Sequence, residues 1–169
     1  MTAPKVLVAG IGNIFLSDDG FGVEVAGRLA TQQLPANVEA VDVGIRGLHL
    51  AYQLLDGYDV LVFVDATALD AEPGTVSVLE IELPALPAST DDGAPVLEGH
   101  SMTPAAVLGM VAGLGGSIGQ TFVVGCQPAT LDEGIGLSPS VAAAVDVAVD
   151  VIVELLAELP NIRREELSA

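Results

Sequence analysis

The sequence GIGNIFLSDDGFG occupies residues 10–22 and directly follows the apolar run Val6 to Ala9. An apolar run that breaks into glycines and then into carboxylates predicts a buried parallel strand, a tight turn and the start of a helix. Open α/β sheets place their ligands in the loop that follows such a strand. We therefore expect Asp18 and Asp19 at one edge of a central sheet, where two carboxylates suit a cation better than a phosphate.

Two glycines of this stretch, Gly10 and Gly12, match part of a dinucleotide-binding fingerprint. That fingerprint needs a third glycine where this chain has Phe15, and no lysine follows a glycine-rich loop as it does in a phosphate-binding loop. A Rossmann-like nucleotide-binding enzyme, with Asp42 at the end of the second strand as the ribose acid, is therefore the weaker alternative.

The composition predicts one domain with an aliphatic core. The chain has 169 residues, of which 51% are hydrophobic and only 4% aromatic. We expect a single domain over residues 1–160 and a flexible tail over residues 161–169. The lone cysteine, Cys126, cannot form an intramolecular disulfide, and the amino terminus does not read as a secretory leader, so we expect a cytoplasmic protein.

The strong net negative charge argues against partners that carry many phosphate groups. The formal net charge is −18, with only five lysines and arginines, so the surface should repel nucleic acid and anionic lipid. The longest apolar stretch, residues 141–159, carries four carboxylates spaced four residues apart. This spacing puts them on one side of a helix, which predicts a core helix with one solvent-exposed face rather than a membrane span. We therefore expect no nucleic-acid partner and no membrane partner.

Strand and helix patterns alternate along the chain. This alternation predicts a three-layer α/β/α sandwich on a mostly parallel five-stranded sheet. The strand that follows the Pro73-Gly74 turn should be an antiparallel edge strand. Residues 84–99 read as a long surface loop, and Pro160 should end the last helix. The predicted strands span residues 6–9, 38–43, 60–64, 75–82 and 121–125, and the predicted helices span residues 21–34, 48–55, 103–114 and 139–159.

Three polar residues should meet at the carboxyl edge of this sheet. Asp19 follows the first strand, Asp65 ends the third, and His100 precedes the helix that opens at Thr103-Pro104. Two carboxylates and an imidazole form an incomplete ligand set, which suits nickel, zinc, iron or cobalt without choosing among them. Cys126 reads as a small buried thiol rather than as a nucleophile.

The motifs together resemble the hydrogenase maturation proteases, which trim the carboxy terminus of [NiFe]-hydrogenase large subunits. The segments that carry the resemblance are residues 8–22, residues 57–66 ending in Val64-Asp65-Ala66, residues 100–108, Val124-Gly125-Cys126-Gln127-Pro128 and Ile135-Gly136-Leu137-Ser138-Pro139. They cover nearly the whole chain, in order.

The resemblance implies a nickel-dependent endopeptidase whose nickel is supplied by the precursor of the large subunit. It assigns metal contact to Asp19, Asp65 and His100. It leaves open whether the nickel polarises the scissile carbonyl or only docks the substrate while a carboxylate activates water, and we take Asp65, with Asp19, as the candidate for the acid/base chemistry. Asp18 could share the metal role. Asp18 and Arg46, which lies in a glycine-flanked loop, are also candidates for substrate binding. The alternative within this resemblance is a non-catalytic nickel-sensing assembly factor with the same three ligands.

Overall fold

The computed structural model describes residues 4–81, 104–116 and 118–168, with side chains described up to residue 159. The strands are β1 (Val6–Ile11), β2 (Val38–Gly44), β3 (Val60–Ala66), β4 (Val76–Ile81) and β5 (Gln120–Cys126). The helices are the 3₁₀ turn η1 (Ser17–Gly20), α1 (Phe21–Ala30), α2 (Gly47–Leu54), α3 (Pro104–Gly113) and α4 (Pro139–Ser168). The predicted loop over residues 84–99 lies outside the described residues.

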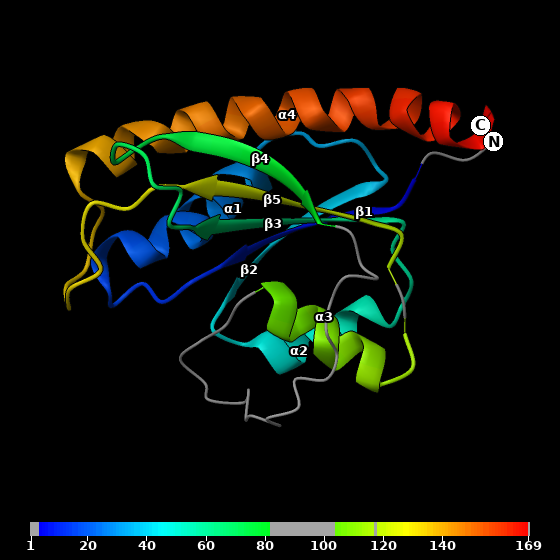
Figure 1. The fold of residues 1–169 in the computed structure, drawn as a ribbon, viewed down its shortest axis with the longest axis horizontal. Helices are drawn as coiled ribbons and strands as arrows, with labels where there is room; N and C mark the ends of the chain where they lie inside the picture. The colour runs from blue at the N-terminus through cyan, green and yellow to red at the C-terminus, as the bar shows by residue number, and fades with distance from the viewer. Residues whose placement is uncertain (1–3, 82–103, 117, 169) are drawn as a thin grey trace.

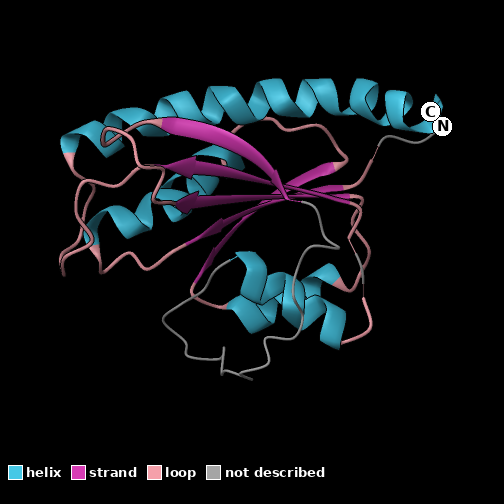
Figure 2. Cartoon of the chain, in the orientation of Figure 1, coloured by secondary structure: helices cyan, strands magenta, loops and turns pink. Residues whose placement is uncertain are grey.

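These strands form one sheet in the order β2-β1-β3-β5-β4. β1 pairs in parallel with β2 and β3, β3 pairs in parallel with β5, and β4 runs antiparallel to β5 at the edge. Figure 2 shows the sheet between two layers of helices. The predicted three-layer fold and its antiparallel edge strand are confirmed, and β1 and β3 are neighbours whose carboxyl ends meet at the same edge.

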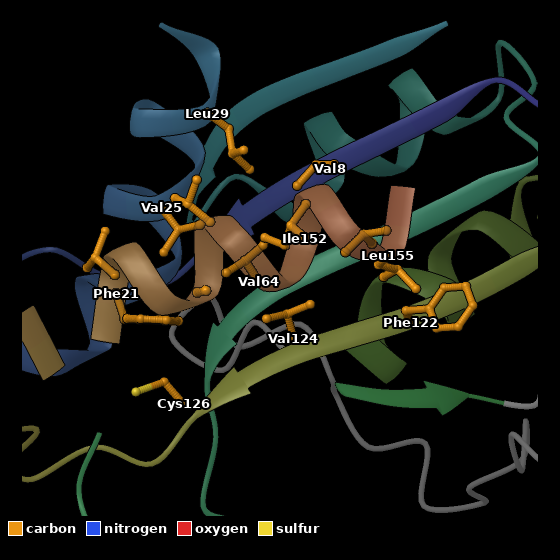
Figure 3. Packing of buried hydrophobic residues seen from close by; sticks show 14 of the residues in the cluster. Val8, Phe21, Val25, Leu29, Val64, Phe122, Val124, Cys126, Ile152 and Leu155 are labelled. Carbon is orange, nitrogen blue, oxygen red and sulfur yellow. The ribbon is translucent and has the colours of Figure 1, made fainter. Parts of the chain in front are cut away.

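Side chains alternate between the two faces of the sheet and build a separate core on each. On one face, Val8, Val64 and Val124 pack against α1 and α4, as Figure 3 shows. On the other face, Leu7 and Phe63 pack against α2 and α3 (Figure 1). Among the described residues, no helix is long and apolar enough to cross a membrane.

Two predicted helix ends are wrong. α1 ends at Ala30 rather than at residue 34, because the Thr31 hydroxyl donates to the carbonyl of Arg28 and the Gln32 N–H donates to Leu29, three residues back. α4 continues through Pro160 to Ser168. A proline removes only one backbone donor, so a helix can bend and resume beyond it. The flexibility of residues 161–169 stays a prediction.

Two glycines allow the first loop to lie directly on the strand ends. A Cβ atom on Gly22 would approach the carbonyl oxygen of Val64 to 2.1 Å, so only glycine lets the first turn of α1 touch β3 this closely. Gly12 has a φ of +138°, and a Cβ atom there would lie 1.9 Å from the carbonyl oxygen of Asp19. The glycines of the opening motif therefore serve close backbone packing, and this packing places Asp19 above the sheet edge.

Candidate active site at the carboxyl edge of the sheet

Asp19 lies in η1, directly after the loop that leaves β1. Its carboxylate accepts a hydrogen bond from the backbone N–H of Asn13, with 2.8 Å between N and Oδ2. Its own N–H donates to the carbonyl of Leu16 at 3.1 Å. Because the side chain is still partly exposed, Asp19 is a carboxylate that the loop positions and that a partner can reach.

Asp65 is the penultimate residue of β3 and is half-buried. Strand alternation puts it on the same face as Leu61 and Phe63, the face that α2 and α3 cover. Burial, and after it the negative charge of Asp19, raise the pKa of Asp65 to about 7, against an opposing hydrogen bond from the backbone of Ala66. A cation shared with Asp19 would stabilise the ionised form of Asp65, and a carboxyl with a pKa of about 7 can take up or release a proton at neutral pH.

The third predicted ligand, His100, lies outside the described residues. Within the described parts of the chain, no group of three or more histidine, cysteine, aspartate or glutamate side chains could hold a metal ion. The structure therefore brings Asp19 and Asp65 to one edge, and the place of His100 beside them stays a prediction. α3, whose first residue is four positions after His100, packs on the same face of the sheet as Asp65.

Asp18 faces away from solvent, although its neighbour in the sequence is partly exposed. It is fully buried, and its carboxylate accepts hydrogen bonds from the N–H groups of Ala129 (2.8 Å), Thr130 (3.1 Å) and Ser138 (2.7 Å) and from the Ser138 hydroxyl (2.8 Å). Burial raises the pKa of Asp18, but these hydrogen bonds outweigh it and hold the pKa below its ordinary value. This geometry gives no support to a substrate or metal contact by Asp18: its carboxylate fastens the β5–α4 loop to η1.

Arg46 lies at the same edge, immediately before α2. Its Nε donates to the carbonyl of Val43 at 3.1 Å and its Nη2 donates to the carbonyl of Asp42 at 2.8 Å. Arg46 is exposed and lines a cavity of about 220 Å³. The cavity is lined by Val41, Asp42, Val43, Arg46, His49, Leu50 and Gln53.

Cys126 is buried in the core at the end of β5, as predicted. Burial, followed by the charge of Asp18, raises the pKa of the thiol to about 11, against a hydrogen bond from the backbone of Gly74. At pH 7 only about one thiol in ten thousand would be ionised, so Cys126 is a poor nucleophile.

We expect Cys126→Ala to retain most of the endopeptidase activity that the sequence predicts, with a small fall in melting temperature from the lost packing. Cleavage assays before and after treatment with iodoacetamide provide a second measurement, which should show no rapid inactivation of the folded enzyme. Complete loss of cleavage in a Cys126→Ala protein with an unchanged circular dichroism spectrum would contradict this assignment.

Comparisons with known proteins agree on one family. The HycI hydrogenase maturation protease model matches residues 23–155. The chain belongs to the hydrogenase maturation protease family. It is 33% identical to the hydrogenase 2 maturation protease of Escherichia coli over 145 residues, 84% of each chain. It is 35% identical to the hydrogenase expression/formation protein HupD of Rhodobacter capsulatus over 84% of this chain and 66% of HupD. The solved structure of the E. coli maturating endopeptidase HybD superposes with a TM-score of 0.73 at 30% identity, covering 91% of this chain and 93% of HybD.

Membership of the hydrogenase maturation protease family makes the chain a peptidase and removes the nucleotide-binding alternative. Sequence reasoning missed one structural partner in this protease. Both the backbone N–H and the hydroxyl of Ser138 donate to Asp18, 120 residues away in the chain, and no local sequence pattern signals this contact.

Proposed function

We propose that this protease removes a carboxy-terminal peptide from the nickel-loaded precursor of a [NiFe]-hydrogenase large subunit. The observation that carries the proposal is the pair of carboxylates at the sheet edge, Asp19 and Asp65, in which the pKa of Asp65 is raised to about 7. A cation shared by the pair would relieve their repulsion, and the nickel in the precursor supplies one at the moment of binding.

In this proposal Asp19, Asp65 and His100 contact the nickel of the precursor. A set of two carboxylates and one imidazole is incomplete, so the remaining ligands come from the precursor. Asp65 has an additional acid/base role, because a carboxyl with a pKa near 7 can both take up and release a proton at neutral pH. Arg46, held by two backbone carbonyls, contacts a carbonyl or carboxylate oxygen of the peptide near the cleavage site.

We also propose a cytoplasmic site of action without nucleic-acid partners. The lone Cys126 fits a reducing compartment, and the net charge of −18 disfavours phosphate backbones.

The deciding experiment compares nickel-free and nickel-loaded precursor. We expect the loaded form to lose a short carboxy-terminal peptide, and the nickel-free form to stay intact however much enzyme is added, because the coordination bonds that anchor it are missing. Mass spectrometry of the large subunit measures both, and reconstitution of the nickel-free precursor with nickel or zinc tests which metal restores cleavage. Equal cleavage of both forms would refute the nickel requirement. Binding of the loaded precursor without cleavage would instead indicate the assembly-factor alternative.

A further inference from the structure

Four large apolar side chains are exposed on the two loops beside the candidate site. They are Ile14, Phe15, Leu131 and Ile135, with exposed fractions of 45%, 60%, 50% and 78%. The first two lie between β1 and η1, and the other two lie between β5 and α4. We call residues 13–17 and 129–138 together the loop platform. Large apolar side chains gathered on an exposed surface are typical of protein interaction sites.

The backbone of the loop platform is held by hydrogen bonds between its two loops. The N–H of Gly134 donates to the carbonyl of Phe15 and the N–H of Ser17 donates to the carbonyl of Gly134, both at 2.9 Å. The Ser17 hydroxyl donates to the carbonyl of Asp132 at 2.6 Å, and Asp18 fastens the far side of the second loop. Figure 1 shows the two loops side by side at the end of the molecule where the parallel strands terminate.

This fastening has an energetic consequence for binding. Ser17 has a φ of +54°, a left-handed backbone conformation that is strained for a serine. Such a conformation persists only where neighbouring contacts stabilise it. The apolar side chains are thus presented by an ordered backbone, and little conformational freedom is lost when a partner covers them.

The loop platform and the candidate site share one segment of chain. Asn13, at the start of the platform, donates its N–H to the carboxylate of Asp19, and Asp19 follows the platform by two residues. A folded protein that delivers a peptide to Asp19 and Asp65 therefore lies within reach of Phe15 and Ile135.

The charges around the platform indicate the complementary surface. Asp132 and Glu133 are exposed between Leu131 and Gly134. Neither loop contains a lysine or an arginine. A partner surface that fits would be apolar at its centre and bordered by basic side chains.

We infer that the loop platform is the docking surface for the folded body of the substrate precursor, which meets it with an apolar patch bordered by basic side chains. This inference rests on the proposed function. It separates two tasks: the platform holds the body of the precursor, and the carboxylate edge handles the nickel and the peptide to be cut.

The test measures KM and kcat for nickel-loaded precursor with Phe15→Ser and Ile135→Ser. We expect each variant to raise KM about tenfold or more with kcat unchanged, as for the loss of one interface anchor. Glu133→Lys should also raise KM, because it places a positive charge against a basic border. The matched control is Val147→Ser, which removes an exposed valine (50%) from α4 and should leave KM unchanged. Phe15→Leu should restore most of the lost affinity.

The outcomes distinguish this inference from the proposed function. If the native enzyme cleaves the loaded precursor but Phe15→Ser and Ile135→Ser do so with native KM, the docking inference is wrong and the function stands. If the native enzyme does not cleave it, the proposed function fails, and binding of loaded precursor to native and variant enzyme, measured by interferometry, still decides whether the platform docks it. A native dimer in sedimentation that Ile135→Ser dissociates, with KM unchanged, would assign the platform to a second copy of this chain and overturn the inference.

Discussion

Asp65→Asn is expected to abolish processing of the nickel-loaded precursor while making the enzyme more stable at neutral pH. In the proposed function Asp65 is an acid/base group, whose loss lowers the rate by about a hundredfold to ten-thousandfold, and a ligand of the precursor's nickel, whose loss also weakens binding of the precursor. A gel assay of the precursor under single-turnover conditions measures this effect. Cleavage by Asp65→Asn at the native rate would remove Asp65 from the active site.

The stability of the same variant should depend on pH in a defined direction. The folded pKa of Asp65, about 7, lies above its ordinary value of 3.8, so folding of the native enzyme is favoured by protonation of this group. The native protein therefore loses stability as the pH rises from about 4 to about 7. The Asp65→Asn variant does not, because the asparagine side chain does not ionise in this range.

Chemical denaturation at a series of pH values measures the difference. The gain of Asp65→Asn over the native protein should be near zero below pH 4, should grow through the interval, and should level off above pH 7 at a few kcal/mol, about 4 at most. Asp150→Asn, which makes the same exchange of carboxylate for amide at an exposed position of α4, is the matched control for the substitution itself. A constant difference in the free energy of unfolding between native and Asp65→Asn protein across this range would show that the pKa of Asp65 is not raised in the folded protein.

Asp18→Ala is expected to be the most destabilising single substitution at this edge of the molecule. It leaves three backbone N–H groups and the Ser138 hydroxyl without their acceptor in a buried place. The cost should be on the order of 3–5 kcal/mol in the free energy of unfolding at pH 7, since a charged acceptor with several donors is lost. Because the folded pKa of Asp18 is lowered, this contribution is present in full above about pH 4 and is lost as the pH falls further.

Urea denaturation followed by circular dichroism measures the cost, with Asp150→Ala as the control on an exposed helix face. Hydrogen exchange should also show faster exchange at the N–H groups of Gly134 and Ser17, because the two loops are no longer fastened. Cleavage should fall with the loosening of the loops even where the protein stays folded. A variant with native stability and native exchange would mean that the four hydrogen bonds of Asp18 contribute little.

The strands and turns that the sequence predicted correctly are those marked by a clear pattern of neighbouring residues. The continuous apolar run before Asp65 predicted a buried parallel strand, and the turn at Pro73-Gly74 predicted an antiparallel edge. The helix ends were less predictable. The end of α1 depends on side-chain and backbone hydrogen bonds around Thr31, and a proline pattern alone does not reveal whether a helix resumes.

The two neighbouring aspartates show why part of the site could not be read from the sequence. Asp18 and Asp19 are the same residue type in the same turn, and either could serve as a ligand by pattern alone. Their surroundings differ through the folded contacts that each makes. Ser138, 120 residues away, donates to Asp18, whereas Asp19 accepts from the nearby Asn13 and its charge acts on Asp65, which follows in β3. Such contacts depend on the packed fold, so only the general position of the carboxylates at the strand ends was predictable.

The hydrogen bonds between Asp18 and Ser138 also bear on how the protein is made. A ribosome must synthesise 120 further residues after Asp18 before its partner exists. Until β5 and the start of α4 have been synthesised, the first loop lacks the backbone donors that bind the Asp18 carboxylate. Contacts of such long sequence separation form slowly, because closing a long loop costs entropy. We therefore expect nascent chains that stop before residue 138 to lack a closed first loop, so that Asp19 is held at the sheet edge only after the start of α4 has been synthesised.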